Sequence, residues 1–457
     1  MKLSGAPAFL FYLSWLWAAA RVRLDRRASI TGTPDVENEG NTQYKTNITL
    51  NDKVFEVLID TGSSDLYVVG DVPGAKDTGK TGSVTYAIGS TKGPIKTATL
   101  GFEGFTIKDQ AFIEQAPDSQ HTEGDGIIGL GPGSSSNVQD EIDNSSGDAP
   151  LDRIFRQNTT TPNYITVLLG RNNDPTDTFA GDFTIGETVD PYGNITSQPK
   201  LPVTDSSSGQ HWTTLMDKNG IIGPDGQRIN TTKRATGNRL NVMFDTGFTF
   251  PQVSNNIANN IYGRVPGAKL ANVTGIGSPI WTLPCDTELN ISFVFSNVVI
   301  PVHPLDTVTD AFHGDDDANG NPTCVGAFQP IILKNQGFDI ILGMSFLRNA
   351  YLLIDFGDFV DGSLSKVGDP FIQLLSITEP VEAHNDFVQC VSVRQRRGLG
   401  SKYKIYIIVG SVVAGFIILT LIVAVSYRAS SKRRYRRLNE PVPEGLPSYG
   451  RPPAQRY

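Results

Sequence analysis

The sequence predicts an all-β fold of two lobes that face each other across a central cleft, followed by one membrane-spanning helix near the C-terminus. Between residues 44 and 380, short apolar or β-branched runs alternate with Gly, Asn, Asp and Pro, as in chains dominated by strands. The run IDTG at 59–62 precedes GIIGLG at 126–131, and FDTG at 244–247 precedes DIILGMSF at 339–346. Each half therefore pairs an acid-bearing turn with a later apolar, Gly-terminated strand, which indicates a duplicated and diverged lobe.

The expected strands follow the apolar runs of the two lobes, which we place at residues 44–215 and 216–380. In chain order these runs are KVFEVLID, DLYVVG, SVTYAIG, TATLGFEGFTI, NYITVLLG, GDFTIG, NVMFD, ISFVFSNVVIPV, DIILG and NAYLLIDF. Helical patterns are few. The clearest is SNNIANNIYGRV, in which Ser254 can cap the helix and Ile257 meets Ile261 on one face. Shorter helical patterns occur at PLDRIF and MSFLRN.

The two ends of the chain predict a type I membrane protein of the secretory pathway, at the cell surface or in an endosome or vacuole. The apolar run FLFYLSWLWAAA ends in small residues, as in a cleavable signal peptide. Residues 406–425 carry no charge over the length that a helix needs to cross hydrocarbon, and the basic residues after them place the C-terminus in the cytosol. The expected segments are a signal peptide at 1–20, a short pro-segment or N-terminal extension at 21–43, a stalk without apolar period at 381–404, a transmembrane helix at 405–427 and a cytosolic tail at 428–457.

The formal net charge of −8 is unevenly distributed along the chain. Residues 428–457 hold eight Lys or Arg and two Glu, so the rest of the chain is strongly acidic. This distribution argues against nucleic acid as a partner, because nucleic acid requires a basic surface with interleaved aromatics. The five histidines are scattered without metal-ligand spacing, and we interpret His211 and His303 as ordinary residues of the β lobes. No metal and no cofactor is expected.

Cysteines and glycosylation motifs also predict an oxidising compartment. Cys285 and Cys324 are expected to close a loop of about forty residues and to stabilise the fold by about 2 to 4 kcal/mol. Cys390, in the expected stalk, is either a capped or unpaired thiol or part of an intermolecular bridge. Seven Asn-x-Ser/Thr motifs precede the expected span and none follows it: Asn47, Asn144, Asn158, Asn194, Asn230, Asn272 and Asn290.

The two acid-bearing turns are the candidates for chemistry. Asp60 ends an apolar run and is followed by Thr61, Gly62 and Ser63, and Asp245 is followed by Thr246 and Gly247. A buried carboxylate costs several kcal/mol unless donors surround it, and hydroxyl residues with an open backbone supply such donors. An ordinary strand ending in a turn is the alternative for one motif. It accounts poorly for two motifs with the same apolar lead-in.

The order and spacing of IDTGSS, SVTYAIGS, GDGIIGLG, FDTG and ILGMSFLR resemble the pepsin family of aspartic peptidases over residues 44–376. The resemblance implies that each lobe gives one Asp to a shared pair that hydrolyses peptide bonds in an extended substrate, without metal, nucleotide or covalent intermediate. Two adjacent carboxylates cannot both ionise cheaply, so the pair holds one proton. One carboxylate then activates water while the other protonates the scissile carbonyl oxygen. An acidic pH optimum is expected.

The resemblance also implies roles for the residues beside the two acids. The amides of Gly62 and Gly247 bond the carboxylates, the hydroxyls of Thr61 and Thr246 tie the two loops together, and Ser63 donates to the outer oxygen of Asp60. The second motif departs from the family pattern because Phe248 stands where Ser or Thr is usual. The missing donor should raise the pKa of Asp245, so that this residue holds the shared proton and Asp60 acts as base. Thr249 is a possible replacement donor.

The segment SVTYAIGS matches the family's flap, a β hairpin that closes on substrate. Tyr86, Gly89 and Ser90 belong to it, and an exposed cross-strand tyrosine is the alternative for Tyr86. Tyr67 replaces a usual Trp and is expected to reach Tyr86 through its hydroxyl. Four acids near the primary specificity pocket indicate either a pocket for basic side chains or a solvated surface: Glu114, Asp118, Glu123 and Asp125.

Two other functions are compatible with parts of the sequence. A catalytically inactive relative that binds peptides or acts as a surface interaction protein is suggested by Phe248. A glycosidase with paired carboxylates fits less well, because its acids stand about 5 Å or more apart and need no DTG loops. Arg26 and Arg27 offer a dibasic processing site, or lie in a merely flexible N-terminus.

Overall fold

A computed structural model describes residues 36–397 except 87–88, 158–160, 173, 176–178, 206–209, 232–235, 274–278, 315–322, 331–336 and 358–367. The expected signal peptide, transmembrane helix and cytosolic tail, as well as Asn158, lie outside the described residues. In the described part of the chain, no helix is both long and apolar enough to cross a membrane.

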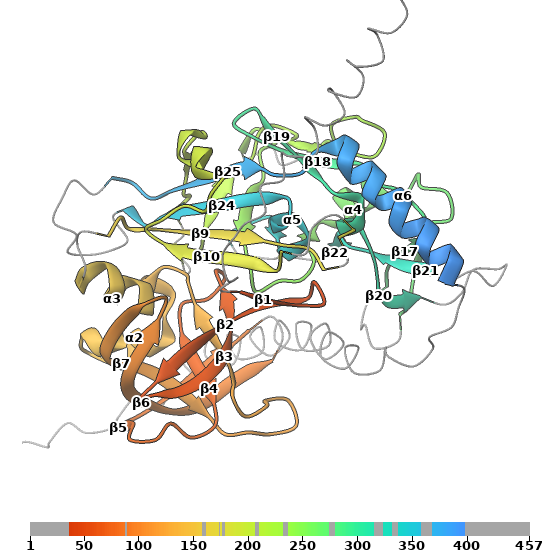
Figure 1. The fold of residues 1–457 in the computed structure, drawn as a ribbon. Helices are drawn as coiled ribbons and strands as arrows, with labels where there is room; N and C mark the ends of the chain where they lie inside the picture. The colour runs from red at the N-terminus through yellow and green to blue at the C-terminus, as the bar shows by residue number, and fades with distance from the viewer. Residues whose placement is uncertain are drawn as a thin grey trace, which may run out of the picture.

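The first half of the chain forms one eight-stranded sheet, drawn in red to orange in Figure 1, with the order β1-β2-β3-β8-β4-β7-β6-β5. Its tight turns use residues that tolerate positive φ; Asn51 and Asp52, at φ 45° and 71°, join β2 to β3. The strands are β1 (Glu37–Glu39), β2 (Gln43–Leu50), β3 (Lys53–Asp60), β4 (Leu66–Val69), β5 (Lys76–Thr85), β6 (Ser90–Phe102), β7 (Phe105–Gln115) and β8 (Asp125–Gly129).

The second half contains three smaller sheets, drawn in green to cyan. The central one has the order β12-β14-β23-β15-β22, with β12 (Thr213–Leu215), β14 (Asn241–Phe244), β15 (Gln252–Val253), β22 (Gln329–Pro330) and β23 (Ile340–Leu342). The second sheet has the order β13-β18-β19, with β13 (Ile221–Ile222), β18 (Ile291–Phe295) and β19 (Val298–Val302). The third has the order β16-β17-β21-β20, with β16 (Lys269–Ala271), β17 (Ile280–Pro284), β20 (Val308–Gly314) and β21 (Thr323–Gly326).

The strand pairing shows the internal repeat directly. β3 pairs in parallel with β8, and β14 pairs in parallel with β23. β4 and β15 lie antiparallel to β8 and β23, and they pair in parallel with β7 and β22. The expected echo between the two halves is therefore present as equivalent sets of four strands, each carrying one DTG turn at the end of its first member.

A further sheet combines strands from both halves in the order β10-β9-β24-β25-β11. In Figure 1 the yellow strands β9 (Tyr164–Leu169) and β10 (Gly181–Ile185) lie beside β24 (Ala350–Asp355) and β25 (Phe371–Ser376), and β11 (Leu201–Pro202) pairs with β25. A single boundary after residue 215 therefore does not separate the sheets, because strands distant in sequence share hydrogen bonds across it.

The helices connect strands, as expected, and most are short. Ser254 caps α4 (Asn255–Tyr262), its hydroxyl accepting a hydrogen bond from the Ile257 amide at 3.4 Å, and Ile257 and Ile261 are buried in the main core. The other helices before the last one, among the described residues, are η1 (Gly133–Ser135), α2 (Asn137–Glu141), η2 (Ser145–Gly147), α3 (Pro150–Gln157), η3 (Gly193–Ser197), η5 (Pro304–Asp306) and α5 (Met344–Leu347).

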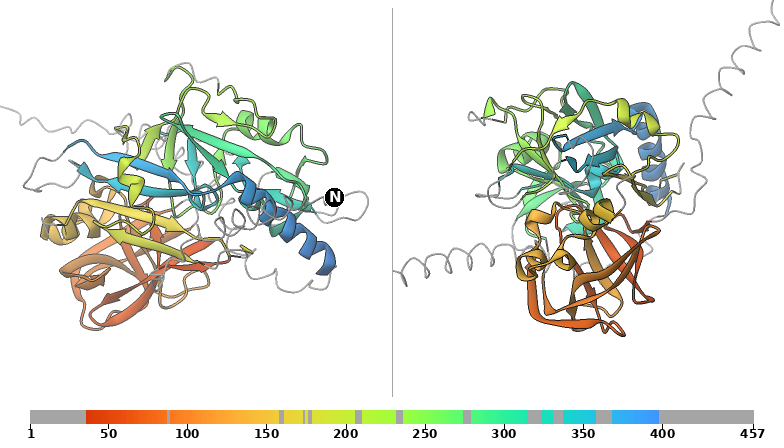
Figure 2. Two further views of the ribbon diagram at one scale, coloured as in Figure 1. Left: turned by 45° about the horizontal axis from the view of Figure 1, so that its top comes forward. Right: turned by 90° about the vertical axis from the view of Figure 1, so that its left-hand side faces the viewer.

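Two segments at the ends of the lobes differ from expectation. Residues 36–43, expected in the N-terminal extension, already belong to the first sheet: Val36 is buried, and β1 pairs with β2. Residues 381–397, expected in a stalk, belong to α6 (Pro380–Arg397), which packs on η5 and lies along the second half in Figure 2. The docking uses few apolar side chains, chiefly Ala383 and Phe387, so the sequence shows no clear apolar period there.

The covalent features fall where the sequence placed them. Cys285 and Cys324 form the expected disulfide, with Cα atoms 4.9 Å apart, because β17 and β21 run antiparallel beside each other. Six of the expected glycan-acceptor asparagines lie in the described part of the chain, and all six are exposed. Their exposure is compatible with glycosylation, which stays a prediction.

Candidate active site

The two DTG turns meet where the two halves of the chain join. Asp60 ends β3 and Asp245 follows β14, and their side chains are 5% and 4% exposed. The backbone of each is fixed by the partner strand: Leu130 N donates to Asp60 O at 2.7 Å, and Asp245 N donates to Leu342 O at 3.2 Å. The parallel pairs β3–β8 and β14–β23 thus deliver one carboxylate each to the same place.

Two fully buried threonines connect the turns through four reciprocal hydrogen bonds. Thr61 N donates to Thr246 Oγ1 and Thr246 N donates to Thr61 Oγ1, both at 3.0 Å. The Thr61 hydroxyl donates to Phe244 O at 3.0 Å, and the Thr246 hydroxyl donates to Ile59 O at 2.8 Å. Because each hydroxyl both donates and accepts across the junction, the two loops cannot move apart without losing all four bonds.

The carboxylates lie against the glycines of the opposite loops. Gly62 N donates to Asp60 Oδ1 at 2.8 Å, and Gly247 N donates to Asp245 Oδ1 at 2.7 Å. A Cβ atom at Gly62 would stand 2.3 Å from Asp245 Oδ2, and one at Gly247 would stand 2.5 Å from Asp60 Oδ1. Glycine is therefore required at both positions, since any side chain there would displace a carboxylate.

The electrostatics of the pair are asymmetric. Burial raises the pKa of Asp245 well above its usual range, and the neighbouring negative charge and side-chain hydrogen bond of Asp60 raise it further. The backbone amides of Gly247 and Phe248 oppose these effects only in part. The two carboxylates lie close together, since a Cβ atom at Gly247 would stand 2.5 Å from Asp60 Oδ1 and 3.0 Å from Asp245 Oδ1. In this arrangement a pair retains one proton at a pH where an isolated Asp has lost it.

The asymmetry has a structural origin in the residue three positions after each acid. Ser63 Oγ donates to Asp60 Oδ2 at 2.5 Å. Phe248 holds the position in the second loop that Ser63 holds in the first. The Ser63 carbonyl accepts a hydrogen bond from Gly131 N and the Phe248 carbonyl accepts one from Met344 N, both at 2.7 Å. Its side chain has no donor. Thr249, the possible replacement, donates its hydroxyl to Thr42 O at 2.9 Å instead, so that expectation is not met.

The expected flap is the hairpin of β5 and β6, closed by Tyr86 N donating to Gly89 O at 3.1 Å, with Gly89 at φ 77° and Ser90 exposed at the start of β6. Residues 87–88 at its tip lie outside the described residues. The Tyr86 ring packs on Tyr67 at 5.8 Å between centroids, but its buried hydroxyl has no hydrogen-bond partner among the described residues. The expected bond from Tyr67 is therefore absent. Burial raises the pKa of Tyr86, and raises that of Tyr67 to about 12.

Comparison with known proteins identifies the family. The model of the family described as eukaryotic aspartyl protease matches residues 72–360. The chain belongs to this family. It is 24% identical over 351 residues to Major aspartyl peptidase 1 of Cryptococcus neoformans, a match that covers 69% of this chain and 68% of the relative. It is 27% identical over 327 residues to a probable aspartic-type endopeptidase of Arthroderma benhamiae, covering 66% and 56%. The chain is thus an aspartic-type hydrolase.

Two further similarities agree with this assignment. Candidapepsin-4 of Candida albicans is 26% identical over 347 residues, covering 69% of this chain and 74% of the relative. Among solved structures, the aspartic proteinase from Irpex lacteus superposes with a TM-score of 0.57 at 20% identity, over 76% of this chain and 97% of that one. At that identity the superposition supports the fold alone, which is mostly β and pepsin-like.

The acids expected near the primary specificity pocket of this aspartyl protease each have a basic partner. The separations are 2.6 Å for Lys96–Glu114, 2.8 Å for His121–Asp118, 3.5 Å for Lys53–Glu123 and 3.8 Å for Lys45–Asp125. These pairs favour the interpretation as a solvated surface over a pocket that selects basic side chains.

Two residues that position the site were missed by the sequence analysis. Asp65 accepts hydrogen bonds from Ser136 Oγ, Asn137 N, Asn137 Nδ2 and Val138 N at 2.6–3.0 Å, so it ties the start of α2 to the first loop. Trp212 is fully buried and donates to Leu130 O at 2.9 Å. Only the proximity of Asp65 to the DTG motif offered any signal in the sequence.

One group of possible metal ligands occurs among the described residues, formed by Asp174, His303 and Asp386. Leu305 N donates to His303 Nδ1 at 3.1 Å, so the neutral ring carries its proton on Nε2, which faces Asp386 at 3.6 Å. Asp174 pairs with Arg171 at 3.1 Å. A ring nitrogen that carries a proton cannot ligate a metal, and the contacts favour a buried polar network that docks α6.

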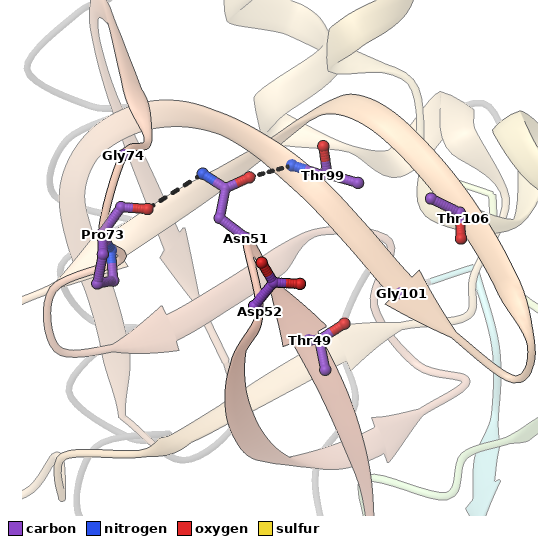
Figure 3. A pocket seen from close by; sticks show the side chains of 8 residues that line it. All are labelled: Thr49, Asn51, Asp52, Pro73, Gly74, Thr99, Gly101 and Thr106. Atoms are coloured by element: carbon purple, nitrogen blue, oxygen red, sulfur yellow. Dashed lines mark hydrogen bonds between the residues drawn. The ribbon is translucent and has the colours of Figure 1, made fainter.

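A surface pocket of about 510 Å³ lies away from the two acids, at the β2–β3 turn and the neighbouring strands β6 and β7 (Figure 3). Asn51 bridges it, accepting from Thr99 N at 2.8 Å and donating to Pro73 O at 3.2 Å. Its only ionisable lining residue is Asp52. One exposed carboxylate without a partner acid does not provide the acid–base pair that peptide hydrolysis requires.

Proposed function

We propose that this aspartyl protease is an endopeptidase in which Asp60 and Asp245 form a catalytic pair that holds one proton. The observation that carries the proposal is the mutual approach of the two carboxylates. Each lies against the glycine of the opposite loop, and burial together with the charge of Asp60 raises the pKa of Asp245. The threonine bonds beneath them keep the pair preorganised.

The donors around the pair support an assignment of roles in the free enzyme. Asp60 accepts from the Gly62 amide and the Ser63 hydroxyl, whereas the donors beside Asp245 are the backbone amides of Gly247 and Phe248, without a hydroxyl. Hydrogen bonds to a carboxylate favour its ionised form. Asp60 is therefore the general base that activates water, and Asp245 carries the proton that passes to the scissile carbonyl oxygen.

The reaction then follows from these two states. Water, deprotonated by Asp60, attacks the peptide carbonyl carbon while Asp245 protonates the carbonyl oxygen, giving a neutral tetrahedral diol. The carboxyl groups next exchange roles: the protonated Asp60 gives its proton to the leaving nitrogen, and Asp245 recovers one from a diol hydroxyl. The carbon–nitrogen bond breaks and both products leave. The singly protonated pair is the working state, so we expect an acidic pH optimum.

Peptides and proteins are the proposed substrates, and the β5–β6 hairpin is proposed to cover them. Tyr86 and Tyr67 form an apolar contact at the base of this hairpin, and Gly89 and Ser90 belong to its exposed end. Closure of such a hairpin over the substrate would exclude bulk water from the pair.

The decisive test measures cleavage of a peptide library by the purified full chain in detergent between pH 2 and pH 8, beside Asp60→Asn and Asp245→Asn. Both variants should lose at least about a thousandfold in kcat/KM. Asp52→Asn, which alters the exposed carboxylate of the pocket in Figure 3, is the matched control and should keep wild-type activity. Cleavage that survives in either dyad variant would refute the proposed site. A wild type that binds peptides without cleaving them would favour the inactive binding protein.

We further propose that the protein is a type I membrane protein of the secretory pathway, with the lobes lumenal or extracellular. The support is the uncharged run at 406–425, the basic residues after it and the apolar N-terminal run; one similar protein is named Secreted aspartic protease 4. The full chain should stay in membranes after alkaline carbonate washing, whereas a chain ending at residue 404 should be released. Release of both would contradict the anchor.

A further inference from the structure

The β5–β6 hairpin rests on a small apolar cluster that is separate from the main core. Its strand β5 carries one buried apolar side chain, Val84, which belongs to this cluster together with side chains of β6 and β7, and Tyr86 packs against it. Val138 of α2 and Ile142, the residue after this helix, complete the cluster. The Tyr86 hydroxyl has no hydrogen-bond partner among the described residues, so its support here is apolar packing.

The helix α2 is too short to be stable by itself. It spans five residues, so its position depends on contacts with the rest of the protein. It packs against β5 and β7 (Figure 1). Its start is bound by the Asp65 carboxylate: Oδ1 accepts from Ser136 Oγ at 2.6 Å and Val138 N at 2.9 Å, and Oδ2 accepts from Asn137 N and Nδ2 at 3.0 and 2.9 Å. The side chain of Asp65 therefore fixes where α2 begins.

The backbone of Asp65 belongs to the same loop as Asp60, and the same segment holds both residues. Leu130 N donates to Asp60 O at 2.7 Å, and Gly129 N donates to Asp65 O at 2.9 Å. The approach at Gly129 is so close that a Cβ atom there would stand 2.6 Å from Asp65 N. Asp65 is thus fixed to the loop of the proposed base through its backbone and to α2 through its side chain.

The second lobe has a different residue at the equivalent position. Phe250 stands five residues after Asp245, as Asp65 does after Asp60, and it packs against the main core. A phenyl ring cannot accept the hydrogen bonds that bind the start of α2. The carboxylate therefore occurs in the lobe that carries the hairpin.

We propose that Asp65 is a positioning residue that, through α2, holds the β5–β6 hairpin over the first DTG loop and so sets the affinity for peptide substrates. This inference rests on the proposed function of Asp60 and Asp245 as the catalytic pair and of the hairpin as the cover of the substrate. Substrate binds tightly only to molecules whose hairpin is in the covering position, so the apparent affinity falls with the fraction of such molecules. A weakened support should raise KM and leave kcat unchanged, because the chemistry within the covered complex does not involve Asp65.

The test measures kcat and KM separately for one peptide, with the full chain in detergent at the pH of maximal activity. Asp65→Asn removes the acceptor of two of the four bonds, and Ile142→Ala shortens the apolar contact while the carboxylate stays in place. Each should raise KM by about fivefold or more, with kcat within about threefold of the wild type. The double variant should raise KM no further than the larger single change, because both changes act through α2.

Two control variants and one further measurement separate positioning from a general loss of stability. Ile185→Ala, in β10, removes the same atoms from a site of similar burial in the main core, 7% exposed against 8% for Ile142, and should keep the wild-type KM. Ile142→Val retains most of the contact and should raise KM by less than about twofold. Amide hydrogen exchange of residues 76–85 and 90–95 should accelerate in Asp65→Asn, while that of β14 should keep the wild-type rate.

The possible outcomes separate the inference from the function on which it rests. An inactive Asp60→Asn beside wild-type KM values in Asp65→Asn and Ile142→Ala would overturn the inference alone. A lower kcat at unchanged KM, or a raised KM in Ile185→Ala, would also overturn it, since the effect would then lie in the catalytic pair or in lost stability. Retained cleavage in Asp60→Asn would overturn the catalytic pair and the inference with it. If Asp65→Asn does not fold, Ile142→Ala decides the question by itself.

Discussion

Phe248 provides the sharpest test of how the protein assigns one proton to two acids. It occupies the position in the second loop that Ser63 occupies in the first, since the carbonyl oxygens of both residues accept an amide at 2.7 Å. The Ser63 hydroxyl reaches Asp60 Oδ2 at 2.5 Å, so the backbone geometry at this position brings a hydroxyl within bonding distance of the carboxylate. Phe248→Ser should therefore give Asp245 the donor that it lacks.

The size of the effect follows from the strength of a hydrogen bond to a charged group, about 1.5 to 3 kcal/mol. One pKa unit corresponds to about 1.4 kcal/mol, so the pKa of Asp245 should fall by about 1 to 2 units. Because burial and the charge of Asp60 raise that pKa in the wild type, the variant should move it back towards its usual value. Asp245 then loses its proton at lower pH, and the alkaline limb of activity moves down with it.

The assay is kcat/KM for a single peptide measured from pH 2 to pH 8, which reports the titration of the free enzyme. Phe248→Ala is the matched control, since it removes the ring and differs from the Ser variant only by the hydroxyl. Ser63→Ala is the reciprocal change and should move the acid limb to higher pH. If the Ser and Ala variants at position 248 share one alkaline limb, the hydroxyl does not act on Asp245 and the assignment of roles is wrong.

Other predictions concern stability, measured by chemical or thermal unfolding of the full chain. Burial raises the pKa of Asp152 to about 7, so the native state binds this proton more tightly than the unfolded chain does. The wild type should therefore lose stability as the pH rises from 4 to 8. Asp152→Asn should be more stable than the wild type by up to about 4 kcal/mol at pH 8 and equally stable at pH 4. Replacing Cys285 and Cys324 by Ser opens a loop spanning 39 residues and should cost about 3 to 4 kcal/mol, whereas an unchanged unfolding midpoint would show that the bridge stabilises nothing. Asp306→Asn leaves the buried Arg171 and Arg348 without their shared carboxylate and should lower the free energy of unfolding by about 3 to 5 kcal/mol. A loss below about 1 kcal/mol would contradict the stabilising role of these ion pairs.

The parts of the fold that were predictable from sequence are those encoded locally and then repeated. A run such as KVFEVLID carries its own strand signal, and the same run followed by DTG in the second half reveals the duplication. The strands of that repeat are present in both halves, and they pair in parallel as β3–β8 and β14–β23, a pairing that the repeat did not specify. The disulfide was predictable for a different reason, because the sequence offers only three cysteines.

The parts that escaped prediction depend on contacts between residues distant in sequence. The sheet that joins β9 to β24 pairs residues near 167 with residues near 352, which no local pattern indicates. The helix α6 docks through two apolar side chains and a buried Asp386, too few to produce a period in the sequence. Thr249 shows the same limit at the site, since its hydrogen-bond partner, Thr42, is 207 residues away.

The duplicated lobes present a chemical problem that the backbone alone does not solve. Two equivalent loops would hold the shared proton equally, whereas acid–base hydrolysis needs one acid and one base when the substrate arrives. The differences between the loops therefore have to come from side chains outside the repeated turns. Ser63 gives Asp60 a hydroxyl donor, whereas the Phe248 side chain offers no hydroxyl to Asp245. Both differences act in the same direction, so Ser63→Ala and Phe248→Ser should each shift a limb of the pH profile without abolishing activity.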